Sequence, residues 1–125
     1  MKKFSIEWKS STKPGKQRKY RFNAPLHIKQ KFVSAHLSKD LRQNLKKRNV
    51  DLRKGDRVKV MRGQFKKHEG KVDRVDLKKS LIFVSGVEAA KKDGTKRALG
   101  LNPSNLMITE LNMDDKQRQK IMGRK

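Results

Sequence analysis

The spacing of hydrophobic residues changes along the chain from a helical period to an alternating one. Residues 24–37 carry apolar side chains at spacings that a helix could gather on one side, with Asn23 as a candidate N-cap and Pro25 in the first turn. Ser38 is a candidate cap for a second helix, which is expected to end near Asn49. This part of the chain is therefore expected to contain two short helices.

Beyond the second helix the period is close to two. Val58 and Val60 alternate with charged residues, which is typical of a strand with one buried face. A further strand opens at Gly70, and the three-residue step from Val72 to Val75 indicates a bulge. Because a bulge bends a strand, this pattern favours a curved sheet.

Turn signals divide the rest of this region into strands. Residues 81–84 form an apolar run of strand length, Asp93-Gly94 is a strong hairpin-turn signal, and residues 102–104 predict a turn before a last strand at 106–108. We therefore expect a mainly β fold in which about five short strands form a small barrel that closes its own edges.

Charged and apolar residues are distributed unevenly, and this predicts the domain organisation. Residues 1–50 hold 15 basic and 2 acidic residues, whereas residues 51–112 hold 15 and 8 and contain 22 of the 41 apolar residues. The core is therefore expected in the second region. The predicted parts are an extended basic arm at 1–22, two short basic helices at 23–50, the barrel at 51–112, and a basic tail at 113–125 that is compatible with a frayed helix or a loose end.

The overall charge points to a polyanionic partner. The chain has 35 Lys and Arg residues against 12 Asp and Glu residues, a formal net charge of +23. Each cation that meets a phosphate releases condensed counterions, so nucleic acid is the natural partner of such a chain. No apolar stretch approaches the roughly 18 residues of a membrane span, and the N-terminal sequence does not resemble a signal peptide. Membrane insertion is therefore not expected.

The sequence lacks the residue patterns of catalysis and metal binding. It has no cysteine, which excludes disulfides, thiolate metal sites and cysteine nucleophiles. His27, His36 and His68 are scattered without metal-ligand spacing, and no carboxylate pair, catalytic triad or glycine-rich phosphate loop occurs. We therefore expect no enzyme activity, no cofactor, no metal and no small-molecule substrate.

Three groups of residues are predicted to contact RNA. The arm can become ordered between RNA helices, the two short helices can direct cations at phosphates, and the loop after Val60 offers hydrogen-bond donors. The predicted contacts in the arm are Lys13, Lys16, Arg18, Lys19, Tyr20 and Arg21. Those in the helices and the loop are Lys29, Lys31, Arg42, Lys46, Arg48, Arg62, Gln64, Lys66, Lys67 and His68.

Three further positions have a structural alternative to an RNA contact. Phe65 could stack on an unpaired base, but we favour an interpretation in which its ring turns into the core. Gly70 is interpreted first as a glycine required by a bulge or a positive φ, and second as a close approach of backbone to RNA. Trp8 could stack on a base or cap the barrel, and the sequence does not separate these two roles.

Residues 54–84 resemble the KOW motif, which is found in ribosomal proteins and transcription elongation factors. The matching positions are Gly55, Asp56, Val58, Val60, Gly63, Phe65, Lys66, Gly70, Val72 and Val75. With the flanking segments FNAPLHIKQKFVSAHLSKDLRQ and NPSNLMIT, residues 4–112 resemble the archaeal and eukaryotic form of large-subunit ribosomal protein twenty-four.

The resemblance carries expectations about fold, partners and location. It implies an SH3-like barrel bound directly to large-subunit rRNA, near the outer rim of the polypeptide exit tunnel and beside other large-subunit proteins. Bacterial relatives are regarded as early assembly proteins, so early binding during subunit assembly is also implied. The location would be the cytoplasm, within the large ribosomal subunit.

Two positions depart from the family pattern. Lys67 stands where many members have a second loop glycine, and a positive φ there would cost roughly 1 kcal/mol of strain. Asn102 stands where members often have histidine before the Pro-Ser-Asn turn. Eukaryotic members usually carry a longer basic C-terminal extension, so the end of this chain at Lys125 favours an archaeal source.

Two other functions are compatible with the sequence. A transcription elongation factor module could use the KOW barrel to contact polymerase, although such modules are usually less basic and have a different N-terminal domain. A chromatin-like protein that coats DNA would suit the charge. Co-purification with polymerase would favour the first alternative, and equal affinity for duplex DNA and structured rRNA would favour the second.

Overall fold

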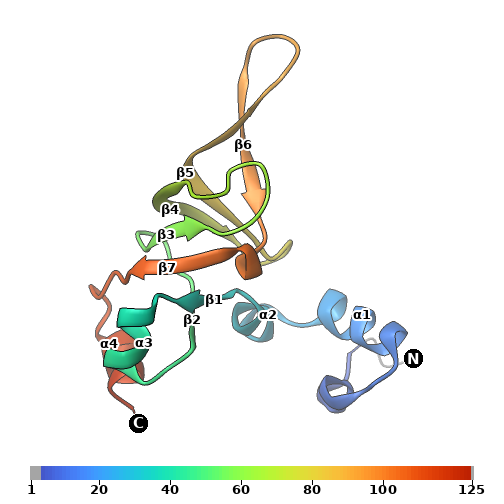
Figure 1. The fold of residues 1–125 in the computed structure, drawn as a ribbon. Helices are drawn as coiled ribbons and strands as arrows, with labels where there is room; N and C mark the ends of the chain where they lie inside the picture. The colour runs from blue at the N-terminus through green and yellow to red at the C-terminus, as the bar shows by residue number, and fades with distance from the viewer. Residues whose placement is uncertain (1–3, 125) are drawn as a thin grey trace.

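The computed structural model describes residues 4–124 and is mainly β (Figure 1). Residues 1–3 of the predicted arm and Lys125 of the predicted tail lie outside the described residues. In chain order the elements are the 3-10 helix η1 (Ile6–Ser10), α1 (Pro14–Asn23), α2 (Leu26–Phe32), β1 (Ser34–Leu37), α3 (Lys39–Leu45), β2 (Asn49–Asp51), β3 (Arg57–Val60), β4 (Glu69–Asp76), β5 (Leu81–Ala90), β6 (Lys96–Leu101), the 3-10 helix η2 (Pro103–Asn105), β7 (Leu106–Glu110) and α4 (Lys116–Gly123).

The strands form one bent sheet in the order β2-β1-β7-β3-β4-β5-β6. β1 and β7 are parallel, and the other neighbouring pairs are antiparallel. β4 pairs with β3 through residues 69–71 and with β5 through residues 72–76, and its register with β5 shifts between Val72 and Arg74. The predicted bulge is therefore confirmed, at the point where β4 passes from one half of the sheet to the other. The fold is the small SH3-like barrel type that was predicted, with β2 and β6 at the ends of the strand order.

The core lies inside the bend of the sheet. Val58 and Val60 of β3 are buried while the charged residues between and before them are more exposed, as the alternating pattern predicts. They meet Ile82 of β5 and Leu106 and Ile108 of β7, which are also fully buried. Each such side chain contributes about 1.5–3 kcal/mol when it leaves water, so these strands supply most of the driving force for folding.

The first predicted helix is shorter than expected. α2 covers only Leu26–Phe32, and residues 34–37 form strand β1 instead. Val33, Ala35 and Leu37 are buried in alternation, and β1 pairs with both β2 and β7. The prediction of one helix through residue 37 is wrong, because pairing and burial between two strands outweigh a weak helical spacing.

The second helix begins as predicted and ends early. The Ser38 hydroxyl accepts a hydrogen bond from the Leu41 backbone N–H at 3.4 Å. α3 then ends at Leu45, because Lys46 adopts a left-handed conformation with a φ of 51°. The chain continues into β2, a three-residue strand that is too short to give an alternating pattern.

The arm that was expected to be extended is helical. Pro14 occupies the first turn of α1, where its fixed φ is favourable, and Asn23 ends α1 instead of capping α2. The Gln17 side-chain amide donates hydrogen bonds to the carbonyl oxygens of Trp8 and Ser11 at 3.0 and 2.8 Å. η1, which contains Trp8, is thereby fastened to α1. These N-terminal helices lie to one side of the barrel (Figure 1).

The predicted tail contains a docked helix. Asp115 caps α4 by accepting a hydrogen bond from the Gln117 backbone N–H at 2.8 Å. Arg118 and Met122 of α4 are buried against the barrel. The Arg118 guanidinium donates two hydrogen bonds, of 2.6 and 2.7 Å, to the fully buried carboxylate of Asp56. α4 is therefore part of the folded domain, a role that was not predicted from the sequence.

Candidate nucleic-acid interface

The basic residues predicted in the arm lie on the exposed surface of α1 and its N-cap. The exposed cations are Lys13, Lys16, Arg18, Lys19 and Arg21. Within the described part of the chain, none of them lies within 4.0 Å of a carboxylate. Five positive charges on this short helix and its N-cap therefore have no counter-charge among residues 4–124 and are available to phosphates.

Tyr20 has a different role from the one predicted. Only 5% of its surface is exposed. Its ring stacks on Phe4, with ring centroids 5.3 Å apart, and meets the ring of Phe32 edge to face at 5.7 Å. Tyr20 therefore holds the N-terminal segment, α1 and α2 together, and this geometry does not support its predicted contact with RNA.

The cations of α2 and α3 differ in how far the protein itself engages them. Lys31 of α2 is exposed, and so are Lys46 and Arg48, which follow the last residue of α3. Lys29 is half-buried, and its ammonium group lies 3.4 Å from the Lys78 carbonyl oxygen. Arg42 is half-buried, and its Nε donates to the Leu37 carbonyl oxygen at 2.9 Å. Because an arginine has five N–H donors, Arg42 can still bind a phosphate with its remaining groups.

The loop between β3 and β4 is ordered by its own backbone. The N–H of Lys66 donates to the Gly63 carbonyl oxygen at 3.1 Å, and the N–H of Lys67 donates to the Val60 carbonyl oxygen at 2.8 Å. Lys67 has a φ of 74°, so the positive φ considered for this position is present. The exposed polar residues of the loop are Arg62, Gln64, Lys66 and Lys67. A pre-ordered loop can present these donors without a large entropic cost.

Three residues in or next to this loop, Phe65, His68 and Gly70, contact β5 or the core. His68 Nε2 lies 2.9 Å from the Ser85 carbonyl oxygen, so this side chain is engaged with β5. Phe65 is half-buried against the core, in agreement with the favoured interpretation. Gly70 does not have a positive φ; instead, a Cβ atom there would lie 2.7 Å from the Ser85 carbonyl oxygen. The glycine is therefore required by the close approach of β5.

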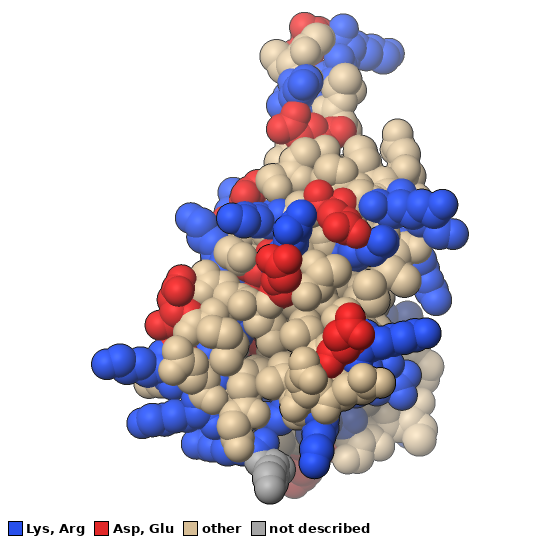
Figure 2. Space-filling model, turned by 60° about the vertical axis from the view of Figure 1, so that its left-hand side comes forward, with Lys and Arg blue, Asp and Glu red and all other residues tan. Residues whose placement is uncertain are grey.

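The predicted contacts do not converge on one patch. In Figure 1 the N-terminal helices and the β3–β4 loop lie toward the right of the molecule, whereas α3 lies toward the left. Figure 2 shows Lys and Arg side chains projecting around the outline of the molecule, with acidic residues interspersed on the barrel. An RNA partner would therefore have to contact the protein from more than one direction.

A basic groove along the β5–β6 hairpin was not predicted from the sequence. This hairpin projects from the barrel (Figure 1), and a groove of 870 Å³ follows its strands. The basic residues that line the groove are Arg74, Lys79, Lys91, Lys96 and Arg97. The Arg74 guanidinium lies 4.3 Å from the centroid of the Phe83 ring, a cation–π contact that holds it at the groove. The basic residues flanking the predicted Asp93-Gly94 turn were the available signal.

Two carboxylates near these loops are held in their charged form. A hydrogen bond and the positive charge of Lys59 lower the pKa of Glu69, whose Oε1 lies 2.9 Å from the Lys59 ammonium. Hydrogen bonds from the Thr95 hydroxyl and backbone N–H lower the pKa of Asp93 at the hairpin tip. Both groups are thus committed to local structure and do not form a catalytic pair.

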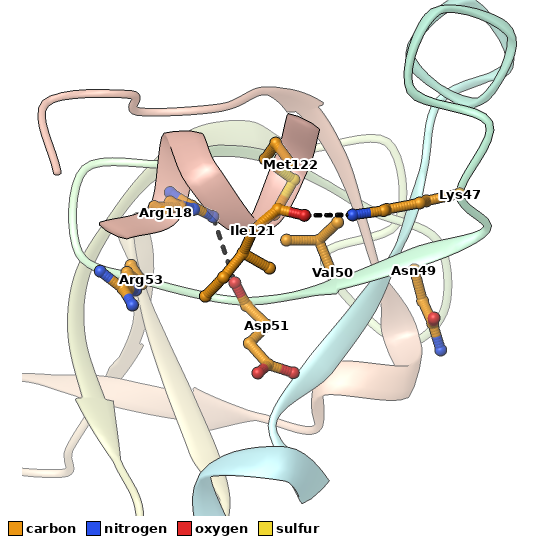
Figure 3. Close-up of a pocket in the computed structure, with 8 residues that line it drawn as sticks. All are labelled: Lys47, Asn49, Val50, Asp51, Arg53, Arg118, Ile121 and Met122. Atoms are coloured by element: carbon orange, nitrogen blue, oxygen red, sulfur yellow. Dashed lines mark hydrogen bonds between the residues drawn. The ribbon is translucent and has the colours of Figure 1, made fainter. Parts of the chain in front are cut away.

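A small pocket of 160 Å³ lies where α4 meets β2 (Figure 3). Lys47 Nζ donates to the Ile121 carbonyl oxygen, and Arg118 donates to the Asp51 carbonyl oxygen at 3.1 Å. Burial raises the pKa of the Asp51 side chain above 3.8, and nearby cations, Arg53 first, partly offset this rise. Because these donors already hold α4 in place, the pocket is a seam of the fold rather than a ligand site.

Two other kinds of site are absent from residues 4–124. No helix there is both long and apolar enough to cross a bilayer. Nor do three or more His, Asp or Glu side chains in those residues gather where they could hold a metal ion. On the face that Figure 2 shows, exposed Lys and Arg side chains project around the outline.

Comparisons with known proteins extend the resemblance to nearly the whole chain. The model of the family that comprises the eukaryotic ribosomal proteins L26 and their archaeal L24 counterparts matches residues 11–125. The "Large ribosomal subunit protein uL24" of Methanothrix thermoacetophila is 52% identical over 114 residues, which cover 91% of this chain and 98% of that protein. The protein of the same name from Methanosphaera stadtmanae is 44% identical over 115 residues, with coverages of 92% and 98%. This chain therefore belongs to the uL24 family of large ribosomal subunit proteins, in its archaeal type.

Proposed function

We propose that this protein is a structural constituent of the large ribosomal subunit that binds large-subunit rRNA directly. Its family is a structural one, so the prediction that the chain is not an enzyme is confirmed. The proposed partners are the rRNA and neighbouring proteins of the same subunit, in the cytoplasm. Direct RNA binding is supported by the distribution of charge rather than by family membership alone.

One observation carries the proposal. Residues 8–39 contain nine Lys and Arg residues and no Asp or Glu. The five cations of the arm are exposed, and no carboxylate in the described chain neutralises them. Such a helix repels itself and gains free energy when phosphates replace its condensed counterions.

The exposed groups suit recognition of shape and backbone rather than of sequence. Side chains of Lys and Arg on α1 and the β3–β4 loop can reach phosphates, and the basic hairpin groove offers a third contact. Folded rRNA presents phosphates of several helices close together, so contacts from different directions screen their repulsion. We further propose, from the family resemblance, that binding occurs early in subunit assembly and near the outside of the exit tunnel.

Sedimentation is the first test of the proposal. A cell lysate is centrifuged through sucrose gradients at moderate and high salt, and the protein is located by mass spectrometry in each fraction. We expect it in the large-subunit peak under both conditions. Its absence from that peak would overturn the proposal, and recovery with polymerase or with DNA would favour one of the two alternatives.

A charge-removal experiment tests direct binding. One variant replaces the five arm cations with glutamine, and a matched control replaces five exposed lysines elsewhere, namely Lys54, Lys71, Lys78, Lys116 and Lys120. Affinity for large-subunit rRNA is measured against salt concentration. The slope of log K against log salt should fall by roughly 0.7–0.9 for each phosphate that the variant no longer neutralises. We expect the larger fall in the arm variant, and equal falls in the two variants would contradict the proposal.

A further inference from the structure

One aromatic side chain of α1 is left exposed by the part of the chain that the structure describes. Phe22 is 81% exposed, the highest value among the large hydrophobic residues of the described chain, whereas Tyr20 of the same helix is 5% exposed. A helix advances 100° per residue, so these two rings point to opposite sides of α1. The buried side of α1 is thus complete without Phe22, and the ring is left on the outward side.

The surroundings of this ring are cationic and open. Arg18 and Lys19 precede Phe22 by four and three residues and therefore lie on the same side of the helix, and both are exposed. Long helical side chains lean toward the helix N-terminus, which directs the Phe22 ring over the turn that carries these two cations. One step further along this side is Gly15, where an added Cβ atom would meet nothing within 4 Å. Within residues 4–124, the space beside Gly15 is therefore open on this side of the helix.

The charge around the ring selects the kind of partner. A protein surface that covered Phe22 would have to bury its flanking cations or pair them with carboxylates, and residues 8–39 provide no carboxylate of their own. An unpaired nucleotide satisfies both needs, because its base has a flat apolar face and its phosphates are anionic. We propose that Phe22 stacks on an unpaired base of the rRNA, while Arg18 and Lys19 contact the flanking phosphates. This inference rests on the proposed function and assigns to the arm a base contact in addition to its charge.

Substitutions at this position separate stacking from bulk and from charge. In the full-length protein, Phe22→Ala and Phe22→Leu should weaken binding to in vitro transcribed large-subunit rRNA by roughly 5- to 100-fold, whereas Phe22→Tyr should retain it. The salt slope should be the same in all three variants, because no charge is removed. Ile6→Ala is the matched control, since Ile6 is also apolar, 68% exposed and in the N-terminal helices.

A second measurement identifies the group that covers the ring. The complex with large-subunit rRNA, and intact large subunits, are irradiated with ultraviolet light, and peptides linked to nucleotides are mapped by mass spectrometry. A link at Phe22 that disappears in Phe22→Leu is the expected result. Wild-type affinity of Phe22→Ala, or a Phe22 contact made only with a neighbouring protein, would overturn the inference while leaving rRNA binding intact. If the wild-type protein itself does not bind rRNA, the proposed function fails first.

Discussion

The N-terminal helix α1 and the C-terminal helix α4 are both short and basic, yet they are attached to the molecule differently. α4 is joined to the barrel by the buried pair of Arg118 and Asp56 and by Met122, which packs in the core. α1 packs mainly on η1 and, through Tyr20, on Phe4 and Phe32. One end of the chain is therefore built into the barrel, whereas the other is ordered by its own aromatic contacts.

The difference shows that the role of a basic residue depends on whether a carboxylate lies close to it. Arg118 meets a carboxylate that is fully buried and that also accepts hydrogen bonds from the backbone N–H groups of Arg53 and Asn112 at 2.9 Å. The cations of α1 meet no carboxylate in the described chain. Positive charge stabilises the fold in the first case, and in the second it is left for a ligand that brings its own negative charge.

Replacing Arg118 with methionine should have the largest effect on stability. The substitution keeps the apolar stem but leaves the Asp56 carboxylate buried without its partner, which costs about 3–5 kcal/mol. Urea unfolding followed by circular dichroism measures the change. Arg53→Met is the control, because the Arg53–Asp115 pair is partly exposed and should contribute about 1 kcal/mol or less. A loss as small in Arg118→Met as in the control would show that α4 is not part of the folded domain.

Replacing Tyr20 with alanine should disrupt α1 without weakening the barrel. Removing the ring deletes both aromatic contacts, and a loss of about 2 kcal/mol in this small cluster would raise the population of the locally opened form roughly 30-fold. Hydrogen exchange followed by mass spectrometry should show faster exchange for the amides of residues 15–23 and unchanged exchange in β3 and β7. Phe22→Ala is the matched control and should leave both regions unchanged, because Phe22 is exposed. Faster exchange across the barrel in Tyr20→Ala would remove the distinction between the two ends.

The strand β3, the bulge in β4 and the turn of the β5–β6 hairpin could be predicted from short stretches of sequence. The alternation of Val58 and Val60, the bulge after Val72 and the Asp93-Gly94 turn each reflect a geometry that a few consecutive residues determine. β1 and β2 escaped prediction because three or four residues carry little periodicity. Their strand conformation depends on partners far away in sequence.

The burial of a side chain was hardest to predict where it depends on residues far away in the sequence. Arg118 is 62 residues from Asp56, so no local pattern could reveal that the tail is docked. Tyr20 and Phe22 look equivalent in the sequence, and only packing against Phe4 and Phe32 makes one an anchor and leaves the other exposed. The lysines and arginines of the arm were predictable, because their exposure needs no partner.

In the barrel, Lys67 is a cation whose backbone conformation destabilises the fold. Its φ of 74° is unfavourable for a residue with a Cβ atom, so Lys67→Gly should stabilise the protein by about 1 kcal/mol in urea unfolding. Lys66→Gly is the control and should not stabilise, since Lys66 has no positive φ and glycine gains entropy in the unfolded chain. If Lys67 contacts rRNA as proposed, both variants should weaken rRNA binding, even though only one relieves strain. A destabilised Lys67→Gly protein would contradict the assigned strain.

The smallest effect is expected at Asp51, in the seam between α4 and the barrel. Burial raises its pKa above 3.8, so the folded protein favours the protonated form. Below about pH 3 this carboxyl is neutral in both the folded and the unfolded chain. As the pH rises through the folded pKa, the fold must hold a partly buried charge, and the folded state loses stability.

Asp51→Asn should therefore be as stable as wild type near pH 3 and slightly more stable at pH 7, by less than about 1 kcal/mol because the site is half-exposed. The Arg118 hydrogen bond should survive, because it is made to the backbone carbonyl of residue 51. Urea unfolding at both pH values, with the exposed Asp73→Asn as control, measures the difference. A variant less stable than wild type at pH 7 would show that Arg53 and Arg118 outweigh burial and that the Asp51 charge itself helps to hold α4.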